Sequence, residues 1–454
     1  MNMQRNEPPA GLQPDRGTQL SRRQVVIIGG GFGGLTAAHS LRRADVDVVL
    51  IDRTNHHLFQ PLLYQVATAA LSPGDIAWPL RTAFRSQSNV RIVMEEVEAI
   101  DRPGRIVRLR DSQPIPFDIL IAAPGARHAY FGHDDWEAYA PGLKTLADGV
   151  DLCERMLLAF EQAERRWDGT QSHKPLTFVI VGGGPTGVEL AGALAEIGRN
   201  AMRPDFPHLQ LGDLRILLVE AGDRLLPAFT PRLSARARAD LERMGVTVMV
   251  NAKVRDVQPG GVVVGEEFIE SSQIIWAAGN RASPILGSLE VDLDGSGRVM
   301  VRPDLTIDGE PWIFVIGDAA SCMDRNGGPL PGLAPVAMQQ GRYVGMVIAN
   351  KLPPEERRPF VYADRGMLAT IGRAKAVAQL GALHFSGLIA WLLWCLVHIF
   401  FLIGIRNRFR VMSEWIWYYV TFKPGARLIY GRQQSHLDHD GVSRSGATPV
   451  DRKP

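Results

Sequence analysis

Two glycine clusters in this sequence have the spacing of a loop that binds nucleotide phosphates. The G-x-G-x-x-G pattern occurs twice, at Gly29, Gly31 and Gly34 and again at Gly182, Gly184 and Gly187. In such a loop the first glycine permits a tight turn, the second lets a pyrophosphate approach the backbone, and the third allows close helix packing. The helix that follows offers unpaired N–H groups and a partial positive charge to anions. The clusters therefore predict two dinucleotide sites.

An acidic residue follows each cluster at the end of the next predicted strand. Asp52 lies 23 positions after Gly29, and Glu220 lies 38 positions after Gly182, which indicates an insertion in the second unit. A carboxylate at this place accepts hydrogen bonds from ribose hydroxyls and repels a 2′-phosphate. Glu220 therefore favours NADH over NADPH, although Arg224 nearby leaves a phosphorylated ribose open. The alternative is that the two acids only cap the strand ends.

The elements that must position these loops form one plan that is used twice. Apolar, β-branched runs at 25–28 and 178–181 predict buried strands before the two clusters, and segments of helical periodicity follow them. After each unit come short strands with turn signals, which end on the apolar runs "ILIAAPGA" and "IIWAAG". The fold class is therefore α/β, with two Rossmann-like dinucleotide-binding units. Two such sites in one chain indicate electron transfer, most commonly between a flavin and a nicotinamide.

The composition excludes several other classes of protein. The net charge is only +2, so no basic field indicates nucleic acid as a partner. The three cysteines, Cys153, Cys322 and Cys395, form no CxxC pair, which argues against a disulfide framework and against a cysteine-based zinc or iron–sulfur site. We expect no bound metal, and we expect the cysteines to be small buried hydrophobic residues in a reducing compartment.

An apolar stretch near the C-terminus, "SGLIAWLLWCLVHIFFLIGI", carries no Asp, Glu, Lys or Arg over twenty residues. That length is about enough to cross a bilayer, which takes roughly 20 residues. Arginines follow it at 406, 408 and 410, and basic residues precede it, so both flanks prefer the cytoplasmic side. An aromatic cluster at 415–419 is suited to a membrane interface. We predict helices that insert into one leaflet, with a single span or a soluble core or dimer helix as alternatives.

The two fingerprints, with "TFVIVGGGPTGVELAGALAEI" and "WIFVIGDAA", resemble the flavoproteins with two dinucleotide-binding domains and a glutathione-reductase-like fold. The segments "NHHLFQPLLYQVATAALSPGDIAWPLR", "LPGLAPVAMQQGRYVG" and "RGMLATIGRAKAVA" narrow the resemblance to type II NADH dehydrogenases. Members of that family pass electrons from NADH through FAD to a membrane quinone without pumping protons. The resemblance covers about residues 24–430. It implies FAD and NADH as cofactors, a quinone and a membrane surface as partners, the cytoplasmic face of the membrane, and a possible homodimer.

The resemblance also assigns contacts to individual residues. It implies FAD contacts at Gly29, Gly31, Gly34, Asp52, Ala123, Gly317, Asp318 and Val336, and NADH contacts at Gly182, Gly184, Gly187, Glu220 and Gly279. Two residues are implied to be catalytic. Glu189 matches a family glutamate beside the flavin and nicotinamide rings, which would polarise or relay protons there. The alternative is a first-turn carboxylate favoured by the helix dipole.

The second residue with an implied catalytic role is Gln339, which keeps the last glutamine of the family's quinone-site pattern A-Q-x-A-x-Q. Pro335 replaces the first glutamine of that pattern. Proline has neither an N–H nor a side-chain amide that could hold a quinone carbonyl. The identity of the quinone is therefore left open by the sequence.

The expected organisation has five parts: a disordered lead at 1–22, an FAD-binding domain at 23–140 and 285–350, an NADH-binding domain at 141–284, a membrane-anchoring region at 351–432, and a disordered tail at 433–454.

Three other functions stay possible for this architecture. A sulfide:quinone oxidoreductase would need reactive cysteines beside the flavin, and a soluble ferredoxin-type reductase would not need the apolar C-terminal block. The third is a flavin-binding redox sensor with negligible turnover.

Overall fold

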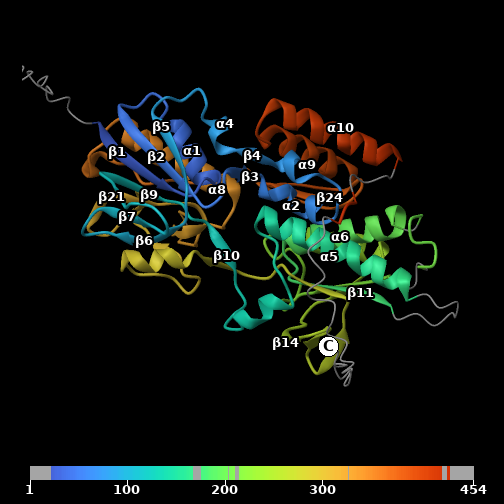
Figure 1. Ribbon diagram of the computed structural model, residues 1–454. Coiled ribbons are helices and arrows are strands. Elements are labelled where there is room, and N and C mark those ends of the chain that lie inside the picture. The colour runs from blue at the N-terminus through green and yellow to red at the C-terminus, as the bar shows by residue number, and fades with distance from the viewer. Residues whose placement is uncertain are drawn as a thin grey trace, which may run out of the picture.

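The computed structural model describes residues 22–166, 175–202, 204–209, 214–325, 327–421 and 427–429. Apart from Arg22, the predicted disordered lead and tail lie outside these residues. Figure 1 shows two α/β units side by side, with the C-terminal helices α9 and α10 placed over α2 and β24. The predicted fold class, two Rossmann-like units with C-terminal helices, is confirmed.

The first unit is built on a six-stranded sheet in the order β20-β21-β9-β1-β2-β5. Its strands are β1 Arg23–Ile28, β2 Val46–Asp52, β5 Val90–Met94, β9 Ile119–Ala122, β20 Thr306–Ile307 and β21 Glu310–Val315. All neighbours pair in parallel except β20 with β21. The central strands are buried on both faces, which explains their unbroken apolar sequences.

Two helices cover one face of this sheet, α1 Phe32–Ser40 and α8 Ala334–Ala349. They lie unusually close because α8 presents glycines to α1. A Cβ at Gly341 would overlap the carbonyl oxygen of Gly33, and one at Gly345 would overlap the side chain of Ser40. This packing links the end of the first unit, some 300 residues along the chain, to the helix that follows the first glycine loop.

The second unit repeats the plan with the four-stranded parallel sheet β13-β12-β11-β17. Its elements are α5 Leu146–Arg165, β11 Leu176–Val181, α6 Pro185–Glu196, β12 Leu214–Val219, α7 Pro231–Arg243, β13 Val246–Met249 and β17 Gln273–Trp276. The short strands predicted after each βαβ unit form matching three-stranded meanders. These are β6 Val97–Asp101, β7 Ile106–Leu109 and β8 Ile115–Pro116, then β14 Val254–Gln258, β15 Gly261–Val264 and β16 Glu267–Glu270. The exact boundaries between the domains stay a prediction.

Smaller elements join the two units. They are β3 His56–Leu58, α2 Leu63–Ala67, α3 Pro73–Ile76, β4 Ala77–Pro79, α4 Leu80–Ala83, β10 Ala126–His128, β18 Asn280–Ala282, β19 Val299–Met300 and β22 Ala320–Ser321. Strands β10 and β18 pair with each other. This pairing makes a two-stranded connection where the chain passes between the units.

The C-terminal region begins with the antiparallel sheet β23 Met367–Gly372, β24 Lys375–Leu380 and β25 Leu383–Ser386. The apolar stretch then folds as α9 Leu388–Phe401, and α10 Ile405–Thr421 follows after a short break. At the break, Gly404 has φ +84°, and a Cβ there would press on the Trp78 ring. Within the described residues, no helix combines the length and apolarity needed to cross a membrane.

Each of the two C-terminal helices is apolar on its outer face as well as on its inner face. The exposed apolar side chains on α9 include Leu388, Leu392, Leu396 and Phe400, and those on α10 include Ile405, Phe409, Met412, Ile416 and Val420. These positions recur every three or four residues, so they form one stripe along each helix. We call them together the apolar stripe. Polar residues would be expected on the outer face of an ordinary surface helix.

Two details of this region differ from the sequence-based interpretation. The aromatic cluster was expected at a membrane interface, but Trp415 is buried and donates to Gln65 Oε1 at 2.8 Å, while only Trp417 is largely exposed. His398 is a polar residue within the apolar run, and it turns inward towards Phe59, with 6.2 Å between the ring centroids. Its Nδ1 lies 2.7 Å from the carbonyl oxygen of Trp394, so the polar atom has a partner inside the protein.

Helix α6 meets strand β23 more closely than side chains would allow. A Cβ at Gly192 would overlap the carbonyl oxygen of Ile371. Glu189, one turn earlier on α6, accepts a hydrogen bond from the N–H of Thr370 on the same strand. Gly192 therefore sets the distance at which the second unit and the C-terminal sheet are joined.

We predict that Gly192→Ala weakens this junction. The forced separation should cost about 1–3 kcal/mol of unfolding free energy, as overpacking usually does, and this exceeds the gain of about 1 kcal/mol in helix propensity. The measurement is the thermal midpoint of the purified protein. Gly287→Ala is the matched control, because a Cβ there meets open space. Equal midpoints for the two variants would contradict the proposed close contact.

Candidate functional site

The first glycine loop has the shape that its sequence predicted. Gly29 has φ +97°, and a Cβ on it would overlap the carbonyl oxygen of Ala123. A Cβ on Gly34 would overlap the carbonyl oxygen of Gly29, so helix α1 can approach β1 only without a side chain there. At Gly31 a Cβ would meet nothing within 4 Å. The loop is thus closed on the protein side and open on the side from which a phosphate would approach.

The second loop repeats this geometry residue by residue. Gly182 has φ +112°, and a Cβ on it would lie 2.8 Å from the carbonyl group of Ala277. A Cβ on Gly187 would overlap the carbonyl oxygen of Gly182, and Gly184 again faces open space. Helix α6 begins at this loop. Each loop therefore presents a free helix N-terminus to a pyrophosphate.

The two acidic residues lie against their loops in the same way. Asp52 Oδ2 accepts from the N–H of Gly30 at 2.6 Å, and Oδ1 accepts from Thr54. Glu220 Oε2 accepts from the N–H of Gly183 at 2.6 Å, and Oε1 accepts from Gly222 at 2.6 Å. These bonds fix the carboxylates. Asp52 Oδ1 accepts from both the N–H and the hydroxyl of Thr54, whereas Asp52 Oδ2 and both Glu220 oxygens keep a second lone pair for a ribose hydroxyl. The ribose contacts of the two acids stay predictions, beside the strand-capping alternative.

The Gly317–Asp318 turn lies at the end of β21, beside the first loop. Gly317 has φ +70°, and its N–H donates to Gln340 Oε1 at 2.6 Å. Asp318 Oδ2 lies 3.9 Å from Lys144 Nζ. Burial lowers the pKa of Lys144, and the carboxylate of Asp318 opposes that shift. The sequence reasoning missed both Lys144 and Gln340, since neither belongs to a recognisable local pattern.

Three of the predicted contacts have other neighbours in the structure. The amide of Gln339 donates to Ala363 O and accepts from Ala363 N, both at 2.9 Å, and does not line the pocket that contains Glu189. The side chain of Val336 is buried in the hydrophobic core. A Cβ on Gly279 would press on the Phe131 ring. The roles assigned to these three residues stay predictions.

Pro335 lies in the first turn of α8, where a backbone N–H has no partner in the helix. Proline is therefore compatible with the fold at this position. The substitution removes an amide side chain from the predicted quinone pattern but leaves the helix intact. Hydrogen-bonding groups for a quinone must come from elsewhere in the chain.

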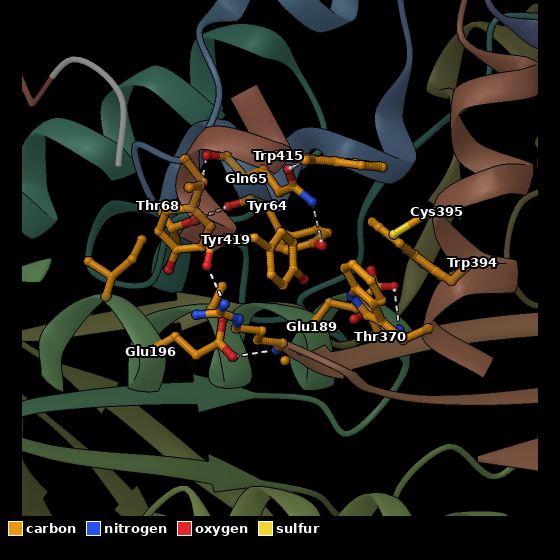
Figure 2. Close-up of a pocket in the computed structure, with 17 residues that line it drawn as sticks. Tyr64, Gln65, Thr68, Glu189, Glu196, Thr370, Trp394, Cys395, Trp415 and Tyr419 are labelled. Atoms are coloured by element: carbon orange, nitrogen blue, oxygen red, sulfur yellow. Dashed lines mark hydrogen bonds between the residues drawn. The ribbon is translucent and has the colours of Figure 1, made fainter. Parts of the chain in front are cut away.

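A pocket of about 580 Å³, counted with its open side, lies between α2, α6, β23, α9 and α10. Figure 2 shows Glu189 and Glu196 along its floor, Tyr64 above them, and Trp394 and Cys395 on the wall that α9 forms. The lining combines aromatic rings with a few polar groups. That combination is typical of a site for a small, largely apolar ring molecule.

Glu189 is the central polar group of this pocket. Its Oε1 accepts from the N–H of Thr370 at 3.3 Å, and the Trp394 indole lies beside it. Burial raises the pKa of this carboxyl to about 8, against the opposing effects of the Thr370 N–H and of the Trp394 indole N–H, which lies towards it. At neutral pH Glu189 is therefore mostly protonated, and it can donate a hydrogen bond or a proton.

The opposite wall is held by a chain of hydrogen bonds from α10 to α2. Trp415 Nε1 donates to Gln65 Oε1, and Gln65 Nε2 donates to the Tyr64 hydroxyl at 2.8 Å. Since Tyr64 accepts this bond, its own O–H is left to point into the pocket. Among the described residues, the buried Trp394 Nε1–H has no partner in hydrogen-bonding geometry. The pocket therefore offers donors to an acceptor-rich ligand.

The cysteines give no sign of a reactive pair. All three are free, and they lie on α5, after β22 and on α9. Burial raises the pKa of the Cys153 thiol to about 11, which leaves it unreactive at neutral pH. Within the part of the chain that is described, no group of His, Cys, Asp and Glu could hold a metal ion.

The geometry fits two dinucleotides. Each loop has an open phosphate side, a helix N-terminus and an oriented carboxylate, and the first loop also has Lys144 and Asp318 beside it. These residues fit FAD at the first loop and a nicotinamide dinucleotide at the second. The pocket at Glu189 adds a third, mostly apolar site beside them.

Comparison with known proteins finds matches to flavin- and nicotinamide-dependent oxidoreductases over nearly the whole chain. Residues 23–341 match the pyridine nucleotide-disulphide oxidoreductase family, and residues 365–421 match the NDH2 C-terminal domain. Two type II NADH:quinone oxidoreductases of Mycobacterium tuberculosis are similar. Ndh is 42% identical, and the match covers 94% of this chain and 93% of Ndh. NdhA is 44% identical, and the match covers 87% of this chain and 86% of NdhA.

Among solved structures, NDH2 from Plasmodium falciparum in complex with NADH has a TM-score of 0.82 at 19% identity, covering 89% of this chain and 99% of its own. The sulfide:quinone oxidoreductase of Aquifex aeolicus has a TM-score of 0.69 at 17% identity, with coverage of 85% and 92%. At these identities the structures show a shared fold alone. The family match and the two mycobacterial relatives go further, and the chain belongs to the type II NADH:quinone oxidoreductases, flavoenzymes that use FAD and NADH.

Proposed function

We propose that this chain oxidises NADH held at the second loop and reduces a quinone in the pocket of Glu189, while docked on a membrane by α9 and α10. The observation that carries this proposal is the composition of the pocket. Helix α6 begins at the NADH loop and supplies Glu189, and the two helices with the apolar stripe supply the opposite wall. A ligand from the membrane and a cofactor from the aqueous side would meet there.

The two carboxylates orient the cofactors. Asp52 and Glu220 would each accept hydrogen bonds from a ribose, and the α1 and α6 N-termini would hold the pyrophosphates. Bound FAD supplies the chemistry of accepting a hydride from NADH and releasing two electrons to quinone. The protein contributes proximity and orientation, so neither a metal nor a covalent nucleophile is required.

The quinone would be held by donors that line the pocket. Protonated Glu189, the Tyr64 hydroxyl and the Trp394 indole N–H can each donate to a quinone carbonyl. These groups would take over from the amide that Pro335 lacks. Glu189 would also give up a proton as the quinone becomes a quinol, and Gln339 keeps its predicted role in the quinone-site pattern as part of this proposal.

The apolar stripe would dock the enzyme on one leaflet. Its exposed side chains include Leu396 at 68%, Phe400 at 64% and Ile405 at 70%, and a soluble surface rarely presents such a row. Arg410 pairs with the buried Asp75 at 3.2 Å and so ties α10 to the first unit. Because NADH is a cytoplasmic substrate, we infer docking on the cytoplasmic face, by monotopic insertion rather than by a single span.

The competing functions receive less support. A sulfide:quinone oxidoreductase would need paired reactive cysteines, and those of this chain are free, lie on separate elements and include the unreactive Cys153. A soluble reductase would not need the apolar stripe. A homodimer is compatible with the fold and stays a prediction. Steady-state NADH oxidation with a short-chain quinone distinguishes the enzyme from a redox sensor.

Glu220→Ala should weaken NADH binding and leave FAD in place. Loss of a charge-assisted hydrogen bond to ribose corresponds to about 1.5–3 kcal/mol, so KM for NADH should rise roughly 10- to 100-fold. The measurement is steady-state kinetics together with the flavin absorbance per chain. Glu267→Ala, on an exposed strand of the same unit, is the control. An unchanged KM, or loss of flavin, would contradict the role of Glu220.

Glu189→Gln should slow quinone reduction on the order of 100-fold or more, because a positioned general acid is removed. Bleaching of the flavin by NADH should persist. In the wild type, quinone reduction should fall as pH rises above about 8, where Glu189 loses its proton. The pH profile of the variant should lack this limb. A wild-type profile that is flat through pH 9 would argue against Glu189 as the donor.

Replacing two residues of the apolar stripe, Leu396→Asp with Ile416→Asp, should weaken binding to phospholipid vesicles by about tenfold, since both charges would enter the interface. NADH-dependent bleaching of the flavin should not change. Co-sedimentation with vesicles measures the effect. Leu293→Asp is the control, because this exposed leucine lies outside the C-terminal helices. Equal vesicle binding by both proteins would refute docking through α9 and α10.

A further inference from the structure

Quinone reduction requires a proton that NADH does not supply. The balanced reaction is NADH + H⁺ + quinone → NAD⁺ + quinol, in which one hydrogen of the quinol comes from the hydride and the other from solvent. The aromatic groups beside Glu189 are buried, with Trp394 2% exposed and Tyr64 7% exposed, while Glu189 itself is half-buried, as Glu196 is. A turnover that uses the proton of Glu189 therefore needs a route by which that carboxylate is protonated again.

A second carboxyl group lies on the same face of α6. Glu196 follows Glu189 by seven residues, which is two helical turns or about 10 Å along the axis. Both line the same pocket, and Figure 2 shows them at two ends of its floor. A separation of this size is too long for direct transfer but can be spanned by water molecules in a polar cavity.

The surroundings of Glu196 differ from those of Glu189. The N–H of Arg373 donates to Glu196 Oε1, and the positive charges of Arg373 and Lys375 stabilise the ionised form. Arg373 and Lys375 are both partly exposed, whereas Trp394 and Tyr64 are buried. The Glu196 end of the pocket is therefore the end where charged groups reach the surface. The tyrosines of α10, Tyr418 and Tyr419, complete this end.

Helix α10 closes over the Glu196 end through Arg373. The guanidinium of Arg373 donates to the carbonyl oxygen of Tyr419 and lies 5.0 Å from the centre of its ring. The lining of the pocket also includes Tyr64, Thr68 and Thr370, which carry hydroxyl groups. The hydroxyls of Thr68 and Thr370 donate to the backbone carbonyls of Tyr64 and Lys375, so they can still accept from a water, while the Tyr64 O–H can donate to one.

A purely structural role for Glu196 explains only part of this arrangement. The carboxylate anchors the turn between β23 and β24 by accepting the Arg373 N–H, and Oε1 alone makes this bond. A glutamine would keep this acceptor but would lose the negative charge that interacts with Arg373 and Lys375. The bond to the turn needs only an acceptor, whereas a carboxyl group can also take up and release a proton. Burial raises the pKa of Glu196, against the effect of Arg373 and Lys375.

We propose that Glu196 is the proton-uptake station of this enzyme and that it reprotonates Glu189 through waters in the pocket during quinone reduction. This inference rests on the proposed function. In each turnover a proton moves from solvent to Glu196, then through the waters to Glu189, and from Glu189 to a quinone oxygen. Glu196 is a positioning residue for the proton, because it does not touch the quinone itself.

The test is Glu196→Gln in the FAD-loaded enzyme, which keeps the acceptor for Arg373. Anaerobic stopped-flow separates bleaching of the flavin by NADH from its recovery with a short-chain quinone. We expect unchanged bleaching, recovery slowed on the order of 10- to 100-fold, and a larger solvent deuterium effect. Added acetate should restore the recovery rate, since a small acid can replace the missing carboxyl. Glu196→Asp should retain much of the rate, and Glu242→Gln on exposed α7 is the control.

Two results would overturn the relay. The first is recovery with quinone at the wild-type rate in Glu196→Gln. The second is slow recovery that neither acetate nor Glu196→Asp restores, which would assign Glu196 to the β23–β24 turn alone. A lowered melting temperature or a lowered flavin content in Glu196→Gln and Glu196→Asp would show that the β23–β24 turn is disturbed. A wild-type enzyme that does not reduce quinone at all would instead refute the proposed function, so the two failures are distinguishable.

Discussion

The contact on which this molecule depends most is the side-chain-free approach of helix α6 to its neighbours. At its start, Gly187 lies against the Gly182 carbonyl, which places the helix N-terminus at the NADH loop. At its centre, Gly192 lies against the Ile371 carbonyl, which joins the helix to the C-terminal sheet. One helix therefore connects the second glycine loop, the carboxyl groups of the pocket and the region that carries α9 and α10.

The C-terminal helices have two functions that follow from having two apolar faces. Their inner faces supply Trp394, Trp415 and Tyr419 to the pocket, and the outer faces carry the apolar stripe. An apolar face that is buried against protein needs no lipid, so only the outer stripe requires a second partner. The wall of the pocket and the apolar stripe are therefore opposite sides of the same two helices, so under the proposed function the quinone site would lie within a helix diameter of the membrane.

The sequence predicted much of the fold because the responsible signals are local. The strand before each loop, the glycines and the terminal Asp52 and Glu220 lie within one short segment, and the structure shows them as expected. The sequence predicted less of the pocket around Glu189. Lys144, Gln340, Tyr64 and Trp394 belong to no short motif, and the aromatic cluster on α10 was placed at an interface although Trp415 is buried. Helical periodicity does not tell which of two apolar faces meets protein.

By itself, the sequence determined two dinucleotide-binding units, their cofactor classes and an apolar C-terminal stretch too long for an ordinary surface helix. Glycine spacing and strand patterning determine these features, since they act over a few residues. Only the tertiary structure decided that the stretch forms the helix α9, which ends before Gly404 and is followed by α10, and that Glu189 and Glu196 share one pocket with these two helices. The physical reason is that burial and electrostatic environment depend on residues hundreds of positions apart, which only the packed chain brings together.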